Sequence, residues 1–349
     1  MEQSWQNRPH GFVKWIQSNR FLLGLISMIG LAWLTPEWGS AGGALKSEIS
    51  RRWAVWLIFF IQGFSLPTES FRQGIGQVRV HGFVLGWNYL GAPLIVLLPL
   101  VGARPWIASE VFVGFAYLAI LPTTITSAVF FTGAAKGNVA TSVFSSVVSN
   151  LASVFLVPAG VALVWWAEHG GQVSLSAMFG KLCLLIVFPM ALGQVLRPAF
   201  WSRLSPHRAW FRRMTTGAIF FIMYCTFSDG VHARAWQPFG WGTLVGILLG
   251  ALVLLAILSI LVWWTSGFLK LERSVRIATF FCGAQKSLAT GVPMASSIFS
   301  GGTGIEGVPE VSVIVVPLMC FHFMQLVLAA KLADRFRFDG VPPLEKPNP

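Results

Sequence analysis

The chain has 349 residues, 55% of them hydrophobic and only 11% charged, and its formal net charge is +12. This composition excludes a soluble globular domain and is typical of a polytopic membrane protein, so we expect one integral membrane domain over residues 1–349, in contact with the lipid bilayer. The positive charge does not indicate nucleic-acid binding, because no soluble domain is present to carry a basic patch. Basic loops that face an anionic lipid leaflet explain it more simply.

Apolar blocks separated by charged or Gly/Pro-containing loops predict ten transmembrane helices. Their expected ranges are 21–36, 52–68, 80–101, 107–131, 138–166, 176–197, 211–229, 239–264, 275–299 and 308–332. The proline-rich tail 341–349 is expected to be disordered. The predicted fold class is therefore an all-α polytopic membrane protein.

The distribution of Lys and Arg predicts how these helices are oriented. With ten spans, 18 basic residues lie on one side of the membrane and 6 on the other. The side with more basic residues faces the cytoplasm. We therefore expect both termini to be cytoplasmic and the protein to lie in the plasma (cell inner) membrane.

Ten helices divide into two groups of five, expected over 20–166 and 176–335. Because five is odd, the second group starts from the opposite side of the membrane, so any repeat is inverted. Inverted repeats are the usual architecture of secondary transporters.

The fourth and ninth helices are expected to be broken in the middle. The first break contains LPTTITS at 121–127, and the second contains GAQKSLATGVP at 283–293. Unwound backbone at membrane depth is tolerated only where it is buried in protein or lines a wet cavity. A pair of such breaks, one per half, is the best pointer in a sequence to a transport site.

Polar residues gather at the first break and along the helix that follows it. The candidates for ion or substrate binding are Thr123, Thr124, Thr126, Ser127, Ser142, Ser146 and Asn150. The last three are spaced i, i+4, i+8 and share one helical face. Such groups ligate a cation or bind a substrate; the alternative is that they only help helices to pack in lipid.

The second break contributes Gln285, Lys286 and Ser287 as candidates, and the tenth helix contributes His322. A charge at the bilayer centre costs at least about 2.5–3.5 kcal/mol, so the ammonium of Lys286 needs carbonyl ends of half-helices, water or a bound anion. Alternatively, this lysine is structural and permanently replaces a cation. His322 belongs to the residue type that titrates near neutral pH, which keeps proton coupling open.

Two glycine patterns predict close-packed helix faces. These are Gly242, Gly246 and Gly250 in the eighth helix, and Gly82 and Gly86 in the third.

Three motifs are absent from the sequence, namely GxxxxGK(S/T), HExxH and GxSxG. Their absence argues against ATP-driven transport by this chain and against a membrane enzyme. We expect no cofactor, with sodium or a proton as the possible coupling ion.

Several segments carry a specific resemblance. Residues 123–158, and above all GNVATSVFSSVVSNLASVFLVP, resemble the fourth and fifth helices of the bile acid:sodium symporter superfamily. FIQGFSLP at 60–67, QKSL at 285–288 with GVP at 291–293, and Pro317, His322 and Gln325 are similar to its SBF-like branch. The resemblance extends from about residue 20 to 335, and it implies ten helices with the two broken ones crossing.

The resemblance also implies which residues would be sodium ligands. They are Ser127, Ser142, Ser146 and Gln285. At three positions this sequence departs from the ligand pattern that the resemblance implies. Ala128 and Lys286 stand where the family has asparagines, and Phe281 stands where it has an acidic ligand. We therefore predict that sodium coupling is weak or absent.

The leading hypothesis is a secondary active transporter that moves a small organic anion by alternating access. The competing hypothesis is a non-transporting regulator of membrane ion homeostasis, for example of calcium, with the same fold. Nothing in the sequence indicates an oligomeric state.

Overall fold

The computed structural model describes residues 20–65, 77–169, 180, 183–299 and 310–338. These residues form helices and no strands. The helices of the first half are α2 (Arg20–Leu34), α3 (Pro36–Gly39), α4 (Ser47–Ser65), α6 (Val78–Gly86), η2 (Trp87–Gly91), α7 (Ala92–Gly102), η3 (Arg104–Trp106), α8 (Ser109–Ala119), α9 (Ile125–Ala134) and α10 (Val139–His169). Those of the second half are η4 (Cys183–Val187), α12 (Phe188–Leu204), η5 (Ser205–His207), α13 (Arg208–His232), α14 (Trp241–Gly267), α15 (Arg273–Ala284), α16 (Leu288–Phe299), α17 (Val311–Ile314) and α18 (Val316–Phe338).

The described part of each predicted segment contains a helix or consecutive helices, and the number of ten membrane spans stays a prediction. Among the described residues, five helical stretches are long and apolar enough to cross a membrane: Val78–Gly102, Val139–Val164, Cys183–His232, Trp241–Gly267 and Val311–Arg337. The molecule is therefore an all-helical integral membrane protein. The repeat boundaries 20–166 and 176–335 stay predictions, and the tail 341–349 lies outside the described residues.

We predicted a loop between the sixth and seventh helices, and this prediction is wrong. α12 continues to Leu204, and the one-turn helix η5 joins it directly to α13. Arginine and leucine are good helix formers, so an arginine-rich connection continues the helix when no Gly is present to end it.

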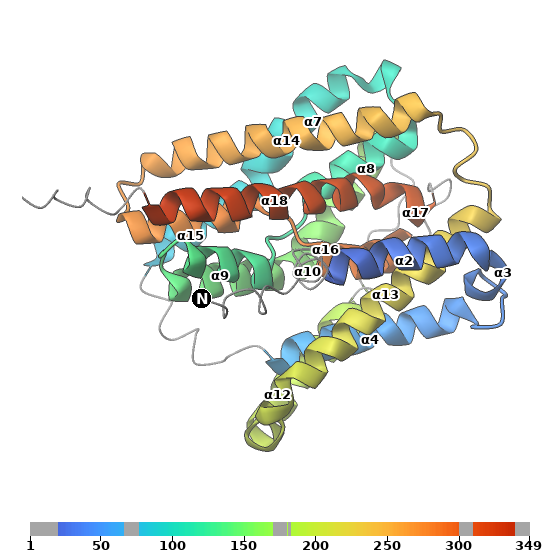
Figure 1. Cartoon of the computed structure of the whole chain (residues 1–349), viewed down its shortest axis with the longest axis horizontal. Helices are drawn as coiled ribbons and strands as arrows, with labels where there is room; N and C mark the ends of the chain where they lie inside the picture. Colours follow the sequence, from blue (N-terminus) through green and yellow to red (C-terminus); the bar gives the residue numbers. More distant parts are fainter. Residues whose placement is uncertain (1–19, 66–76, 170–179, 181–182, 300–309, 339–349) are drawn as a thin grey trace, which may run out of the picture.

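The helices pack in two groups (Figure 1). α4 packs on α12 and α13, and α13 also packs on α2; we call α2, α4, α12 and α13 the four-helix layer. The second group contains α6 to α10 and α14 to α18, with α14 against α15 and α18, and α10 against α9 and α15. The two groups meet where α13 contacts α16 and α17, and where α4 contacts α16.

Four of the five glycines in the two predicted faces are not close-packed against the described part of the chain. Gly82, Gly86, Gly242 and Gly246 have nothing within 4 Å of the position of a Cβ, whereas a Cβ at Gly250 would lie 2.9 Å from the ring of Phe115. A spacing pattern identifies small residues on one face, but it does not say whether a neighbouring helix covers that face.

The close approach occurs instead between α4 and α12. A Cβ at Gly63 would collide with the backbone of Met190, and a Cβ at Gly193 would collide with the backbone of Phe60. The absence of side chains lets these two backbones touch, as in other helix pairs packed by small residues in membranes.

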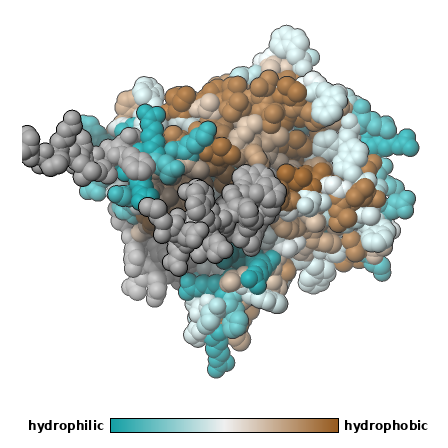
Figure 2. Space-filling model, viewed as in Figure 1, coloured by the Kyte–Doolittle hydropathy of each residue, from teal (hydrophilic) through white to brown (hydrophobic). Residues whose placement is uncertain are grey.

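The surface in Figure 2 has apolar side chains gathered over its middle, and hydrophilic side chains at the left end, the lower tip and the right edge. Exposed apolar residues are numerous, including Leu94, Leu98, Leu249 and Ile260. An apolar band between polar ends is what a bilayer requires of a protein surface.

Candidate functional site

Both predicted helix breaks are present, and they touch each other. The first is the stretch 120–124 between α8 and α9, and the second is 285–287 between α15 and α16. The backbone N–H of Ser287 donates to the carbonyl oxygen of Pro122 at 2.9 Å. Helix ends leave backbone groups without intrahelical partners, so each break offers groups that the other can satisfy.

The side chain of Lys286 extends from the second break to the first. Its Nζ donates to the carbonyl oxygens of Ala119 and Leu121, at 2.8 and 2.9 Å, where α8 ends. It also contacts the backbone and side-chain oxygens of Asn88 at 3.3 and 3.4 Å. The side chain is fully buried. The C-terminal end of a helix carries partial negative charge, so it stabilises an ammonium group.

Among the described residues the one ion pair joins Arg51 and Asp229, so Lys286 has no carboxylate partner in this part of the chain. Four oxygens of uncharged groups surround its Nζ instead. This arrangement corresponds to the structural role that the sequence left open for this lysine.

Asn88 lies in η2, a π-helical turn inside the third predicted segment. It is fully buried, and its Nδ2 donates to the carbonyl of Cys282 at 3.1 Å. Single π-helical turns inside α-helices frequently mark functional positions. Here the widened turn places one side chain between the end of α15 and the ammonium of Lys286.

The backbone of Lys286 is held by α18. Its N–H donates to Oε1 of Gln325, and its carbonyl accepts from Nε2 of Gln325, both at 2.8 Å. Nδ1 of His322 lies 3.3 Å from the same carbonyl and 2.6 Å from Nε2 of Gln325. These contacts satisfy the unwound backbone at the break.

Asn150 on α10 links the two breaks. Its Nδ2 donates to the carbonyl of Thr123 at 2.8 Å, and its Oδ1 accepts from the hydroxyl of Thr290 at 2.8 Å. Thr290 in turn contacts the hydroxyl of Ser287 at 3.1 Å. One carboxamide therefore connects the first break with the first turn of α16.

The four candidate sodium ligands contact protein groups. Ser127 donates to Oε1 of Gln285 at 2.7 Å, which joins α9 to the second break. Ser142 and Ser146 lie 3.4 and 3.5 Å from the Sγ of Cys282. A hard cation prefers oxygen ligands, and a thiol is a poor one.

Phe281 occupies the position at which the resemblance implies an acidic ligand. Phe281 is fully buried and stacks on Phe131 of α9, with ring centroids 6.0 Å apart. Its ring also packs against Phe336. This position contributes packing and no charge.

The candidates are not equally placed. Thr123, Thr124, Ser142, Ser146, Asn150, Gln285, Lys286 and Ser287 are buried around the crossing, Ser127 and His322 are half-buried, and Thr126 is exposed. The structure therefore brings ten of the eleven together and turns Thr126 away, since neighbouring residues on a helix face different directions.

Two buried polar atoms at the crossing have no hydrogen-bond partner: Oγ1 of Thr123 and Nε2 of Gln285. Buried polar groups are nearly always paired, so an unpaired one calls for an explanation such as a bound ligand or water. These atoms are where a solute would find free hydrogen-bonding capacity.

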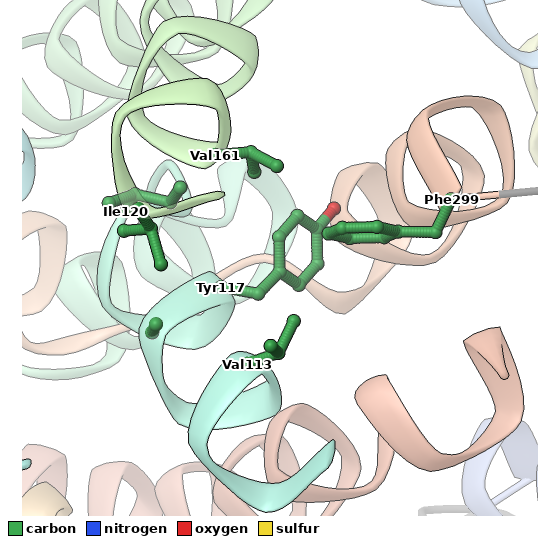
Figure 3. Close-up of a pocket in the computed structure, with 7 residues that line it drawn as sticks. Val113, Tyr117, Ile120, Val161 and Phe299 are labelled. Carbon is green, nitrogen blue, oxygen red and sulfur yellow. The ribbon is translucent and has the colours of Figure 1, made fainter. Parts of the chain in front are cut away.

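A small apolar pocket lies between α8, α10 and α16 (Figure 3). Figure 3 shows the ring of Tyr117 with Ile120 to its left, Phe299 to its right, Val161 above it and Val113 below it. The hydroxyl of Tyr117 donates to the carbonyl of Gly291 at 2.6 Å. No candidate site residue lines the pocket, so it does not form part of the polar crossing.

Four residues of the crossing were not among the candidate site residues: Asn88, Cys282, Thr290 and Gln325. Asn88 and Gln325 are polar residues inside apolar segments, and that is a usable signal because each must find a partner there. Cys282 gives no such signal, because a buried cysteine usually behaves as a small apolar residue.

Two interrupted helices that meet around buried polar groups inside an all-helical membrane protein are an arrangement typical of transporters. The chain belongs to the SBF-like CPA transporter family, whose model matches residues 19–338.

The chain is also similar to curated proteins, and their names support the family assignment. The Escherichia coli (strain K12) protein named "Putative symporter YfeH" is 34% identical over 317 residues, which is 91% of this chain and 92% of the relative. The Pseudomonas aeruginosa protein PA2026 is 33% identical, over 91% of this chain and 92% of its own. The Danio rerio protein "Sodium/bile acid cotransporter 7" is 26% identical, over 92% and 94%. Family and names point to a transporter rather than an enzyme.

Proposed function

We propose that the protein is a secondary active transporter that moves a small organic anion by alternating access. Ten transmembrane helices form two inverted repeats, and the four-helix layer moves relative to the rest. The contact between the two helix breaks, with Lys286 between them, is the observation that carries the proposal, because unwound backbone at membrane depth is the mark of a transport site.

The charge of the groups at the crossing favours an anionic solute. No carboxylate contacts the crossing among the described residues, whereas an ammonium lies inside it. The unpaired Thr123 Oγ1 and Gln285 Nε2 are able to donate hydrogen bonds to an anion. A cationic solute would find no counter-charge there.

Sodium is not the coupling ion in this proposal. Phe281 supplies no charge, Ser142 and Ser146 contact a thiol, and Lys286 already satisfies the carbonyls that end α8. The positive charge that the crossing requires comes from the chain itself.

An unbiased uptake screen in proteoliposomes tests this function. Vesicles with purified protein are incubated with a metabolite mixture, with a sodium gradient, with a proton gradient or with neither. We expect accumulation of an organic anion that is independent of sodium. Accumulation that rises steeply with millimolar sodium would contradict the coupling, and accumulation of a cation would contradict the solute class.

The proposed topology places both termini in the cytoplasm of the plasma (cell inner) membrane. Reporter fusions after Arg337, near the end of α18, test it. A cytoplasmic reporter should be active there and an externally active reporter silent. The reverse pattern would reject the ten-span arrangement.

One observation favours a second function, that of a non-transporting regulator of membrane ion (for example calcium) homeostasis. The ammonium of Lys286 joins the two breaks through hydrogen bonds that leave it no exposed surface, which favours a fixed crossing. If no solute moves in the screen while deletion of the protein changes cytosolic calcium, the regulator is the better account.

A further inference from the structure

A second charged cluster lies where α13 packs on both α4 and α17. Arg51 of α4 forms an ion pair with Asp229 near the end of α13, and the two side chains are only 9% and 16% exposed. The other oxygen of Asp229 accepts from the backbone N–H of Ala41 at 2.7 Å. Partly buried pairs of this kind are screened by salt much less than surface pairs.

A third charged group, Glu310, lies near this pair, because it stands two residues before Ser312, whose hydroxyl lies against Gly230, the residue after Asp229. Glu310 precedes α17, and its side chain makes no hydrogen bond to the start of that helix. Burial and the negative charge of Asp229 raise the pKa of Glu310, and the positive charge of Arg51 opposes them in part. One positive and two negative charges therefore act on one another here, and full ionisation leaves one negative charge without compensation.

Buried hydroxyls without partners flank the two carboxyl groups. Ser228 precedes Asp229, and Ser312 lies in the first turn of α17; both are fully buried and unpaired. A Cβ at Gly230 would collide with the hydroxyl of Ser312 and lie 3.1 Å from Nε1 of Trp236, which is also unpaired. Groups of this kind bind water that delivers and removes protons.

Other titratable or charged residues lie on the elements packed around the cluster. They include Glu37 on α3, Glu48 and Arg52 on α4, Tyr224, Cys225 and His232 on α13, and Glu110 on α8, which packs on α17. α16 has no titratable residue. The charges that act on Glu310 are those of Asp229 and Arg51, so the cluster is a three-residue unit within the described chain.

We propose that Glu310 and Asp229, together with the guanidinium of Arg51, form a proton-binding site, and that this proton is the coupling ion. The second half of the statement rests on the proposed transport function. Arg51 and Asp229 belong to the four-helix layer and Glu310 to the other helix group, so the site bridges the two bodies that move in alternating access.

The charge of the site changes with the proton. With Glu310 protonated the cluster is neutral, and the two helix groups pack against each other. When Glu310 loses its proton to water, two carboxylates face one guanidinium and repel across the boundary between α13 and α17. Loss of the proton therefore favours separation of the two groups at this end of the molecule.

Infrared spectroscopy of the reconstituted protein tests the site without a solute. The carbonyl stretch of protonated carboxyl groups is followed from about pH 4 to pH 8, a range that begins near the reference value of glutamate. We expect wild type to retain a protonated carboxyl above that value, and Glu310→Gln to lack it. Glu48→Gln removes an exposed acid of α4 and should leave it unchanged.

A third variant tests the interaction among the three charges. In Asp229→Asn the guanidinium is free to compensate Glu310, so the midpoint should shift to lower pH, with folding checked by size-exclusion chromatography. A carboxyl signal unchanged in Glu310→Gln, or a midpoint unchanged in Asp229→Asn, would overturn the site. If the carboxyl titrates as expected but no solute moves, the site stands and the transport function fails. If solute moves without this titration, the site fails and the transport function stands.

Discussion

The two helix breaks are alike in position but opposite in chemistry. The first break, between α8 and α9, presents carbonyl oxygens: those of Ala119, Leu121, Pro122 and Thr123 all accept hydrogen bonds from outside α8 and α9. Toward these oxygens the second break, between α15 and α16, presents donors, namely the ammonium of Lys286 and the N–H of Ser287. Its own acceptors, the carbonyl of Lys286 and Oε1 of Gln285, are bonded by α18 and α9 instead.

This difference gives the crossing a positive charge of its own. A bound cation would need oxygen ligands from both breaks, and the second break instead supplies a compact cation with three donors, the ammonium of Lys286. The two breaks thus differ at one side chain that sets the charge of the crossing.

The largest expected effect comes from removing the donor. Lys286→Ala leaves the carbonyls of Ala119 and Leu121 unpaired and removes the positive charge. The variant should still insert, because span nine carries one charge fewer. Uptake per inserted protein should fall about tenfold or more, the change expected when about 1.4 kcal/mol or more is lost.

Lys331→Ala, which removes an exposed lysine of α18, is the matched control and should transport normally. Near-normal uptake by Lys286→Ala would mean that the lysine is incidental.

A smaller loss is expected when the charge is kept but its shape is changed. Lys286→Arg puts a larger, planar guanidinium into a fully buried position whose acceptors are arranged around a single nitrogen. Uptake should be lower than in wild type. Wild-type uptake would show that charge alone, without the geometry of these carbonyls, is sufficient.

The link between the breaks is tested by Asn150→Ala. The carbonyl of Thr123 and the hydroxyl of Thr290 lose their shared partner, at a cost of about 1–3 kcal/mol for a buried group left unpaired. Thermal unfolding in detergent should occur at lower temperature. The control is Thr265→Ala, because the hydroxyl of Thr265 bonds within its own helix. This variant should change the unfolding temperature little. Equal decreases of the unfolding temperature in both variants would argue against a bridging role of Asn150.

The smallest effect is expected at Ser127. If its hydroxyl only bonds Gln285, Ser127→Ala removes one hydrogen bond worth about 0.5–1.5 kcal/mol and leaves uptake nearly unchanged. If the hydroxyl is a metal ligand, the same variant should abolish uptake and its sodium dependence. Uptake of wild type and variant at several sodium concentrations separates the two.

The sequence predicted the breaks because their signals are local. Pro122 lacks an N–H, and the stretch 283–293 combines Gly, Pro and a lysine in an apolar segment. Both interruptions, and the burial of Lys286 between them, are present in the structure. Local chemistry was sufficient because unwound backbone in a membrane protein must be accompanied by polar partners.

Features that depend on neighbouring helices were not predictable. Ser142 and Ser146 share a face, as their spacing requires, but the thiol of Cys282 across from them became visible only in the structure. The glycine pattern around Gly246 indicated a contact face, yet no described helix covers it. Periodicity gives the direction of a side chain along one helix and says nothing about which element it meets.

Equilibrium binding of radioactive sodium to the purified wild-type protein tests most directly whether the ammonium of Lys286 takes the place of a metal cation at the crossing. Because that ammonium already occupies the carbonyls of the first break, we predict no saturable sodium binding in the millimolar range. Saturable binding that disappears in Gln285→Ala would contradict this claim, since it would place a metal ion beside the lysine.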